Sequence, residues 1–124
     1  MRILLDTHVL LWWLGDDRRL PAAVGKALND GTNEVLVSSI SVAEISIKTS
    51  LGKLHSPDDL LAQLRAASMV WLPFTADHAI ALRDLPWHHR DPFDRMLVVQ
   101  ALTESLTLAT VDPACRQYAV QTLS

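Results

Sequence analysis

The chain has 124 residues, of which 49% are hydrophobic and 20% are charged, and its formal net charge is −3. This length is close to the commonest size of a single domain, so we expect one domain over residues 1–124. The charge excludes a strongly basic nucleic-acid binder, although a cluster of acidic metal ligands would itself make the balance negative.

Two further features limit the setting of the chain. Apolar runs such as Val9–Leu14 are much shorter than the ~18 residues that span a membrane, so no membrane partner is expected. Cys115 is the only cysteine, which excludes an internal disulfide and favours a reducing, cytoplasmic location.

Short apolar runs alternate with segments of helical spacing along the whole chain. The expected strands are Ile3–Leu5, Glu34–Val37, Val70–Leu72, Leu106–Ala109 and a last one around Val120–Leu123. The expected helices are Val9–Leu14, Pro21 to about Asp30, Ser41 to about Leu51, one that opens at Ser56–Asp59, one from Thr75 to about Leu85 and one that opens at Asp91. This alternation predicts an α/β fold with a mostly parallel sheet, in which sites gather at the carboxyl ends of the strands.

The helix that opens at Asp91 carries an unusual acid. Asp91 is suited to be its N-cap, and Pro92 is suited to its first position. Asp94 lies on the same helix face as the apolar residues that follow it, where a carboxylate is normally paired or bound to a metal. Asp94 therefore has two interpretations, as the second member of a capping box with Asp91 or as a ligand.

Three other acids can meet Asp94. Asp6 directly follows the first expected strand, Asp112 directly follows the fourth, and Glu44 lies beside the apolar stripe of its helix. Each also has a structural interpretation, Asp6 and Asp112 as N-caps and Glu44 as the partner of Ser41 in a capping box. Taken together, two acids at strand ends and two near helix starts predict one acidic site.

A divalent cation would relieve the repulsion between these carboxylates. Ligation by oxygen alone favours Mg²⁺, or Mn²⁺, over zinc, and no pair of histidines has zinc-ligand spacing backed by cysteine. His88 and His89 simply precede a turn bounded by proline. A carboxylate-bound Mg²⁺ is suited to phosphate chemistry, because it activates water and neutralises the charge that develops at phosphorus.

Four segments, in this order and spacing, resemble the PIN-domain ribonucleases, and more narrowly the VapC-type toxins of type II toxin–antitoxin pairs. They are Leu4–His8, Ser41–Ile45, His89–Arg95 and Thr110–Asp112. The resemblance covers essentially the whole chain. It implies a three-layer α/β/α domain, Mg²⁺-dependent cleavage of RNA, a homodimer, and inhibition by a cognate antitoxin protein.

The resemblance also assigns residues. It implies that four acids are catalytic and bind the metal: Asp6, Glu44, Asp94 and Asp112. Thr7 and Thr110 match positions that border the site, where a hydroxyl could orient a carboxylate or a water. Asp91 is kept as a cap that could also support the site.

Beyond the resemblance, the sequence offers candidate contacts to the substrate. Arg90 and Arg95 flank the central acid and could contact RNA phosphates, or they could be surface charges at a helix start. Trp71 and Trp87 are expected to pack against the protein rather than to stack on bases.

Three other functions compete with the nuclease. A haloacid-dehalogenase-type phosphatase needs a second Asp two residues after the first, where this chain has His8, and a receiver domain needs an acidic pair after the first strand. A catalytically silent PIN-like binding module stays open, although all four acids are present. The sequence therefore predicts a metal-dependent endoribonuclease toxin that uses metal-activated water, with a silent binding module or a metal-dependent phosphatase as alternatives.

Overall fold

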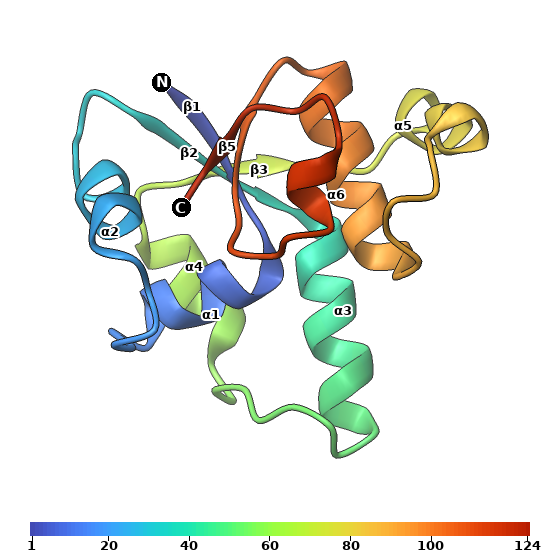
Figure 1. Cartoon of the computed structure of the whole chain (residues 1–124). Coiled ribbons are helices and arrows are strands. Elements are labelled where there is room, and N and C mark those ends of the chain that lie inside the picture. Colours follow the sequence, from blue (N-terminus) through green and yellow to red (C-terminus); the bar gives the residue numbers. More distant parts are fainter.

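The computed structural model describes all residues from 1 to 124 and contains one five-stranded sheet (Figure 1). The strands are β1 (Arg2–Leu5), β2 (Glu34–Ser38), β3 (Val70–Leu72), β4 (Thr107–Ala109) and β5 (Thr122–Leu123). Their order across the sheet is β3-β2-β1-β4-β5, and every neighbouring pair is parallel. The predicted α/β fold with a mostly parallel sheet is confirmed.

Helices cover both faces of this sheet. They are α1 (Thr7–Leu14), α2 (Ala22–Leu28), α3 (Ser39–Ser50), α4 (Leu60–Ala66), α5 (Ala76–Ala81) and α6 (Pro92–Thr103), with 3₁₀ turns at Leu82–Asp84 and Cys115–Gln117. Helices α1, α2 and α4 pack on one face, and α5 and α6 on the other. None of the helices is long and apolar enough to cross a membrane.

The side chains of β1 show how the two layers are separated. Ile3 and Leu5 point into the core beneath α1, α2 and α4, whereas Leu4 points into the core beneath α6. All three are fully buried, as expected for a central strand of a parallel sheet whose side chains alternate between two covered faces.

The strand order changes direction beside β1. From β1 the chain moves outward on one side to β2 and β3, and it later returns to pair β4 with the other side of β1. The carboxyl ends of two such strands border the crevice in which open α/β sheets bind their ligands. A backbone hydrogen bond from Asp6 N to Ala109 O (3.0 Å) holds these two ends together.

Three helix starts differ from the prediction. Helix α1 begins at Thr7 rather than Val9, because Asp6 caps it. Helix α3 begins two residues earlier than expected, because Ser38 Oγ caps it by accepting from Ile40 N (3.0 Å). Helix α4 begins only at Leu60, and its N-cap residue Asp59 forms no side-chain cap bond. The Ser–Pro–Asp–Asp pattern at residues 56–59 therefore resembles the start of α6 in sequence without acting as one.

Candidate metal centre

Asp6 lies at the carboxyl end of β1, where the strand gives way to α1. Its Oδ1 accepts a hydrogen bond from Val9 N (2.8 Å), so it is the N-cap of α1. The residue is buried, and this burial raises the pKa of its carboxyl group, against the opposing effects of the Thr110 hydroxyl and the Val9 amide. The charge of Asp112 raises that pKa further, which places both strand-end acids in one electrostatic environment.

Glu44 projects from the second turn of α3 toward the start of α1. Its Oε1 accepts a 2.6 Å hydrogen bond from Thr7 Oγ1, and its Oε2 pairs with Lys48 Nζ. Ser41 does not form the predicted capping box with Glu44, because α3 begins upstream and the Ser41 hydroxyl instead lies 3.2 Å from Thr7 Oγ1. Glu44 is therefore a buried acid that the Thr7 hydroxyl orients, as the sequence analysis expected of a bordering hydroxyl.

Asp94 lies in the first turn of α6. Asp91 Oδ1 caps this helix by accepting from Phe93 N (2.8 Å) and Asp94 N (3.4 Å). The reciprocal bond of a capping box is absent, because the Asp91 amide donates to His89 Nδ1 (3.0 Å) rather than to Asp94. The Asp94 carboxylate thus has no part in the cap.

The Asp94 carboxyl group is strongly perturbed. Burial, followed by the negative charge of Asp91, raises its pKa to about 7. The charges of Glu44 and Asp6 act in the same direction, while His89 opposes them. The charges of Glu44 and Asp6 therefore reach Asp94, whereas Asp112 is the only other predicted acid whose ligand atoms form one compact group with those of Asp94.

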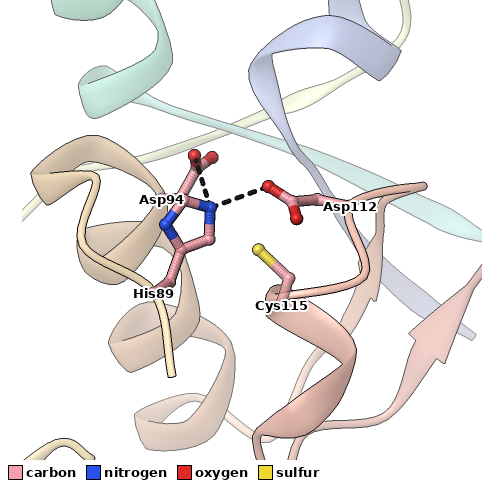
Figure 2. A group of neighbouring side chains, drawn as sticks. All are labelled: His89, Asp94, Asp112 and Cys115. Atoms are coloured by element: carbon pink, nitrogen blue, oxygen red, sulfur yellow. Dashed lines mark hydrogen bonds and ion pairs between the residues drawn. The ribbon is translucent and has the colours of Figure 1, made fainter. Parts of the chain in front are cut away.

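His89 lies between Asp94 and Asp112 (Figure 2). Its Nε2 is 2.7 Å from Asp112 Oδ2 and 3.2 Å from Asp94 Oδ2. Because its Nδ1 accepts the Asp91 amide, the proton of the neutral ring lies on Nε2 and is donated toward the two carboxylates. His89 thus links the acid after β4 to the acid of α6.

Cys115 completes a compact group of side chains. Potential ligand atoms of His89, Asp94, Asp112 and Cys115 all lie within 4.8 Å of one another. Burial, followed by the charges of Asp94 and Asp112, raises the pKa of the Cys115 thiol to about 12. Since the thiolate rather than the thiol binds metals, and since His89 Nε2 carries a proton here, the carboxylate oxygens are the available ligands.

Asp112 differs from Asp94 in its electrostatic environment. Burial alone would raise its pKa, but the hydrogen bonds that it accepts from His89 and from the Ala114 amide outweigh this effect, and its pKa lies below the ordinary value. The Thr110 hydroxyl accepts from the Asp112 amide (3.1 Å), which fixes the turn after β4. One acid of the pair is thus held as an anion, while the other readily takes up a proton.

The two arginines near the site have different surroundings. Arg90 is exposed and forms no salt bridge. Arg95 is buried, and its guanidinium donates to backbone carbonyls that include those of Pro86 (2.9 Å) and Leu85 (3.2 Å). Contact with RNA phosphates stays a prediction for both residues.

This arrangement suits a hard divalent cation. Carboxylate oxygens of Asp94 and Asp112 lie in one compact group. Burial and neighbouring negative charges together raise the pKa of Asp94 to about 7, and a cation would balance those charges. Oxygen ligands are those that Mg²⁺ and Mn²⁺ prefer. The acidic cluster could therefore hold a metal ion.

Sequence reasoning did not identify His89 and Cys115 as members of this group. His89 stands two residues before the N-cap of α6, in a turn bounded by proline, and Cys115 is an isolated cysteine in the sequence. Their closeness in sequence to Asp94 and Asp112 is a signal that could have found them. The contacts themselves depend on the pairing of β1 with β4, which the sequence did not specify.

Comparison with known proteins places the chain in a family. The model of the PIN domain family matches residues 3–121. Ribonuclease VapC22 from Mycobacterium tuberculosis is 28% identical over 124 residues, which span 94% of this chain and 91% of that protein.

Solved structures with the same fold cover nearly the whole chain. VapBC2 from Rickettsia felis, bound to a DNA fragment from its promoter, matches with a TM-score of 0.74 at 16% identity and covers 99% of this chain and 98% of its own. FitAcB from Neisseria gonorrhoeae matches with a TM-score of 0.64 at 22% identity, covering 98% and 96%. DNA-bound VapBC from Salmonella typhimurium matches with a TM-score of 0.67 at 18% identity, covering 99% and 97%. The resemblance noted in the sequence is confirmed: the chain belongs to the PIN domain family.

Proposed function

We propose that this protein is a Mg²⁺-dependent endoribonuclease of the VapC type. The observation that supports the proposal is the acidic cluster in which ligand atoms of Asp94 and Asp112 lie within 4.8 Å of one another, with Asp6 and Glu44 near enough for their charges to raise the pKa of Asp94. The ribonuclease name of the relative from Mycobacterium tuberculosis supports RNA as the substrate.

The residues of the site would have separate roles. A bound divalent cation would lower the pKa of a water and neutralise charge at the phosphate during an in-line displacement. Asp6 and Asp94 would supply oxygen ligands from the two sides of the crevice, and Thr7 holds the Glu44 carboxylate in one orientation. His89 orients Asp112 by its 2.7 Å contact, as residues that support metal ligands commonly do.

Partners follow from the same comparisons. The VapBC and FitAcB structures support a cognate antitoxin that binds and inhibits this chain. The homodimer and the cytoplasmic location stay predictions, the latter consistent with the free, buried thiol of Cys115.

The direct test is cleavage of RNA by the purified, antitoxin-free chain with Mg²⁺ and with EDTA. We expect cleavage that requires Mg²⁺, that is lost in Asp94→Asn and that is kept in Asp58→Asn, a matched change at an exposed acid far along the chain from the cluster. Purifying all three proteins identically controls for contaminating ribonuclease. Equal cleavage by the parent and Asp94→Asn, or none by the folded parent, would contradict the proposal and favour a silent binding module.

The ends of the products test the nucleophile. If water attacks the phosphodiester and the P–O bond to the ribose 3′-oxygen breaks, that oxygen leaves and takes up a proton, and the products carry 5′-phosphate and 3′-hydroxyl ends. Products with 2′,3′-cyclic phosphate ends would show attack by the ribose 2′-hydroxyl and would contradict this mechanism.

A further inference from the structure

The loop before α6 presents a tryptophan to solvent. Trp87 is 75% exposed, which contradicts the expectation that it packs against the protein. One side of its ring is nevertheless occupied, because the Arg95 Cζ atom lies 3.6 Å from the ring centroid. The opposite face of the indole is open.

Arg95 is a rigid support for this ring. It is buried, and in addition to its bonds to loop carbonyls its guanidinium contacts the Tyr118 hydroxyl (3.3 Å). The same hydroxyl donates to Pro86 O (2.7 Å) and accepts from His89 N (3.0 Å). Hydrogen bonds therefore hold Pro86 and His89, which flank Trp87 in the sequence. Because this loop is already ordered, a ligand that stacks on Trp87 would lose little free energy by ordering it.

The surroundings of Trp87 carry positive charge and lie beside the acidic cluster. A groove of about 320 Å³ runs along the ring, and Arg83 and Arg90 lie on its rim. Arg83 is 3.7 Å from Asp84, whereas Arg90 has no acidic partner. Trp87 is two residues from His89, a separation of at most ~7 Å between Cα atoms, and His89 touches both Asp94 and Asp112.

We propose that Trp87 is a stacking platform for an unpaired base of the RNA substrate, with Arg90 contacting a phosphate of the same strand. The proposal rests on the nuclease function proposed above and extends it to recognition of the substrate. Proteins hold single-stranded RNA by stacking its bases on aromatic side chains and by neutralising its backbone with basic ones. The basic rim and the adjoining acidic cluster favour RNA over a protein segment as the occupant.

Binding and cleavage can be separated experimentally. In the Asp94→Asn background with Mg²⁺ present, the affinity for a short fluorescein-labelled single-stranded RNA is measured by anisotropy, with a duplex of the same sequence as a second probe. We expect Trp87→Ala to weaken single-strand binding roughly 5- to 150-fold, since stacking contributes about 1–3 kcal/mol per base. Trp87→Phe should retain most of the affinity, because its ring still stacks.

Two controls test whether the effect is specific to Trp87 and to single-stranded RNA. Trp71→Ala, a change at a partly exposed tryptophan on β3 that lies outside the groove, should leave the affinity unchanged. Binding of the duplex, whose bases are already paired, should be insensitive to Trp87→Ala. Thermal denaturation of each variant confirms that it is folded.

The outcomes separate this inference from the proposed nuclease. Unchanged single-strand affinity in Trp87→Ala, or equal losses in the alanine and phenylalanine variants, would overturn the platform even if the parent cleaves RNA. A selective loss in Trp87→Ala would support the platform even if the parent with Asp94 intact does not cleave. Absence of RNA binding by the parent would overturn both.

Discussion

Helix α6 contributes to two buried polar clusters that differ in how their charges are satisfied. In the first, Gln100 accepts from Ser38 Oγ and donates to Pro73 O (3.3 Å), and next to it His78 Nε2 pairs with Glu104 Oε1 (2.9 Å). In the second, Asp94 lies among other acids that raise its pKa to about 7.

The balance of donors and acceptors gives the two clusters different effects on stability. In the Gln100 cluster donors match acceptors, so the network joins α6 to the end of β2 and stabilises the fold. In the Asp94 cluster acceptors outnumber donors, and the imbalance costs stability in the absence of a cation. Carboxylates with strongly shifted pKa values in a crevice are typical of functional sites.

The largest expected effect comes from neutralising an acid of the site without disturbing its helix. Asp6→Asn keeps an N-cap, because asparagine caps helices as well as aspartate, but it removes a charged ligand. We expect RNA cleavage to fall at least about 100-fold, with little change in thermal stability. Glu104→Gln, a matched change in the Gln100 cluster, should leave RNA cleavage near the parent rate. Equal losses of cleavage in both variants would contradict the difference in role between the two clusters.

Breaking the Gln100 network should act on stability instead. Gln100→Met keeps an unbranched side chain but leaves the Ser38 hydroxyl without its partner. We expect the free energy of unfolding, measured in urea, to drop by roughly 1–3 kcal/mol, while the folded fraction retains its specific activity. A stability equal to that of the parent would show that the network does not hold the fold.

The pH dependence of the metal-free protein should report Asp94. Its folded pKa of about 7 lies above the ordinary value of 3.8, so the folded state binds this proton more tightly than the unfolded chain. Below about pH 4, Asp94 therefore does not lower the free energy of unfolding. As the pH rises toward 7, it lowers that free energy progressively. In EDTA, we expect the stability advantage of Asp94→Asn to grow over that window to on the order of 1–2 kcal/mol; an advantage independent of pH would contradict the assignment.

A smaller effect is expected at Thr7. Thr7→Val keeps the shape of the side chain but removes the hydroxyl that donates to Glu44 Oε1. Loss of such a supporting bond should reduce cleavage roughly tenfold and change stability by less than about 1 kcal/mol. The comparison with Thr7→Ser, which restores the hydroxyl, distinguishes lost orientation from altered packing.

Much of this architecture could be predicted from the sequence, because strands covered on both faces appear as continuous apolar runs and acids that follow them lie at carboxyl ends. Asp6 and Asp112 stand out because they directly follow strands, and Asp94 and Glu44 because they lie on or beside an apolar helix face; the resemblance to PIN-domain ribonucleases selects these four as ligands. The start of α3 could not be placed, because Ser38, Ser39 and Ser41 are all suitable caps, and tertiary contacts decide among them.

Other features depend on contacts between distant segments. The exposure of Trp87 follows from Arg95 and Tyr118, which support its loop from residues far along the chain. The position of His89 between two acids likewise requires the turn after β4 to pack against α6. Neither arrangement leaves a periodic pattern in the sequence.

We expect the acidic cluster to bind a divalent cation, and its unbalanced charge to weaken the metal-free fold. The most direct test is thermal denaturation of the parent and of Asp94→Asn near neutral pH, in EDTA and with increasing Mg²⁺. We predict that the variant melts at a higher temperature than the parent in EDTA, and that Mg²⁺ stabilises the parent in proportion to its binding while leaving the variant almost unchanged. A parent that Mg²⁺ does not stabilise, or a variant that Mg²⁺ stabilises equally, would contradict the assignment of the acidic cluster as a cation site.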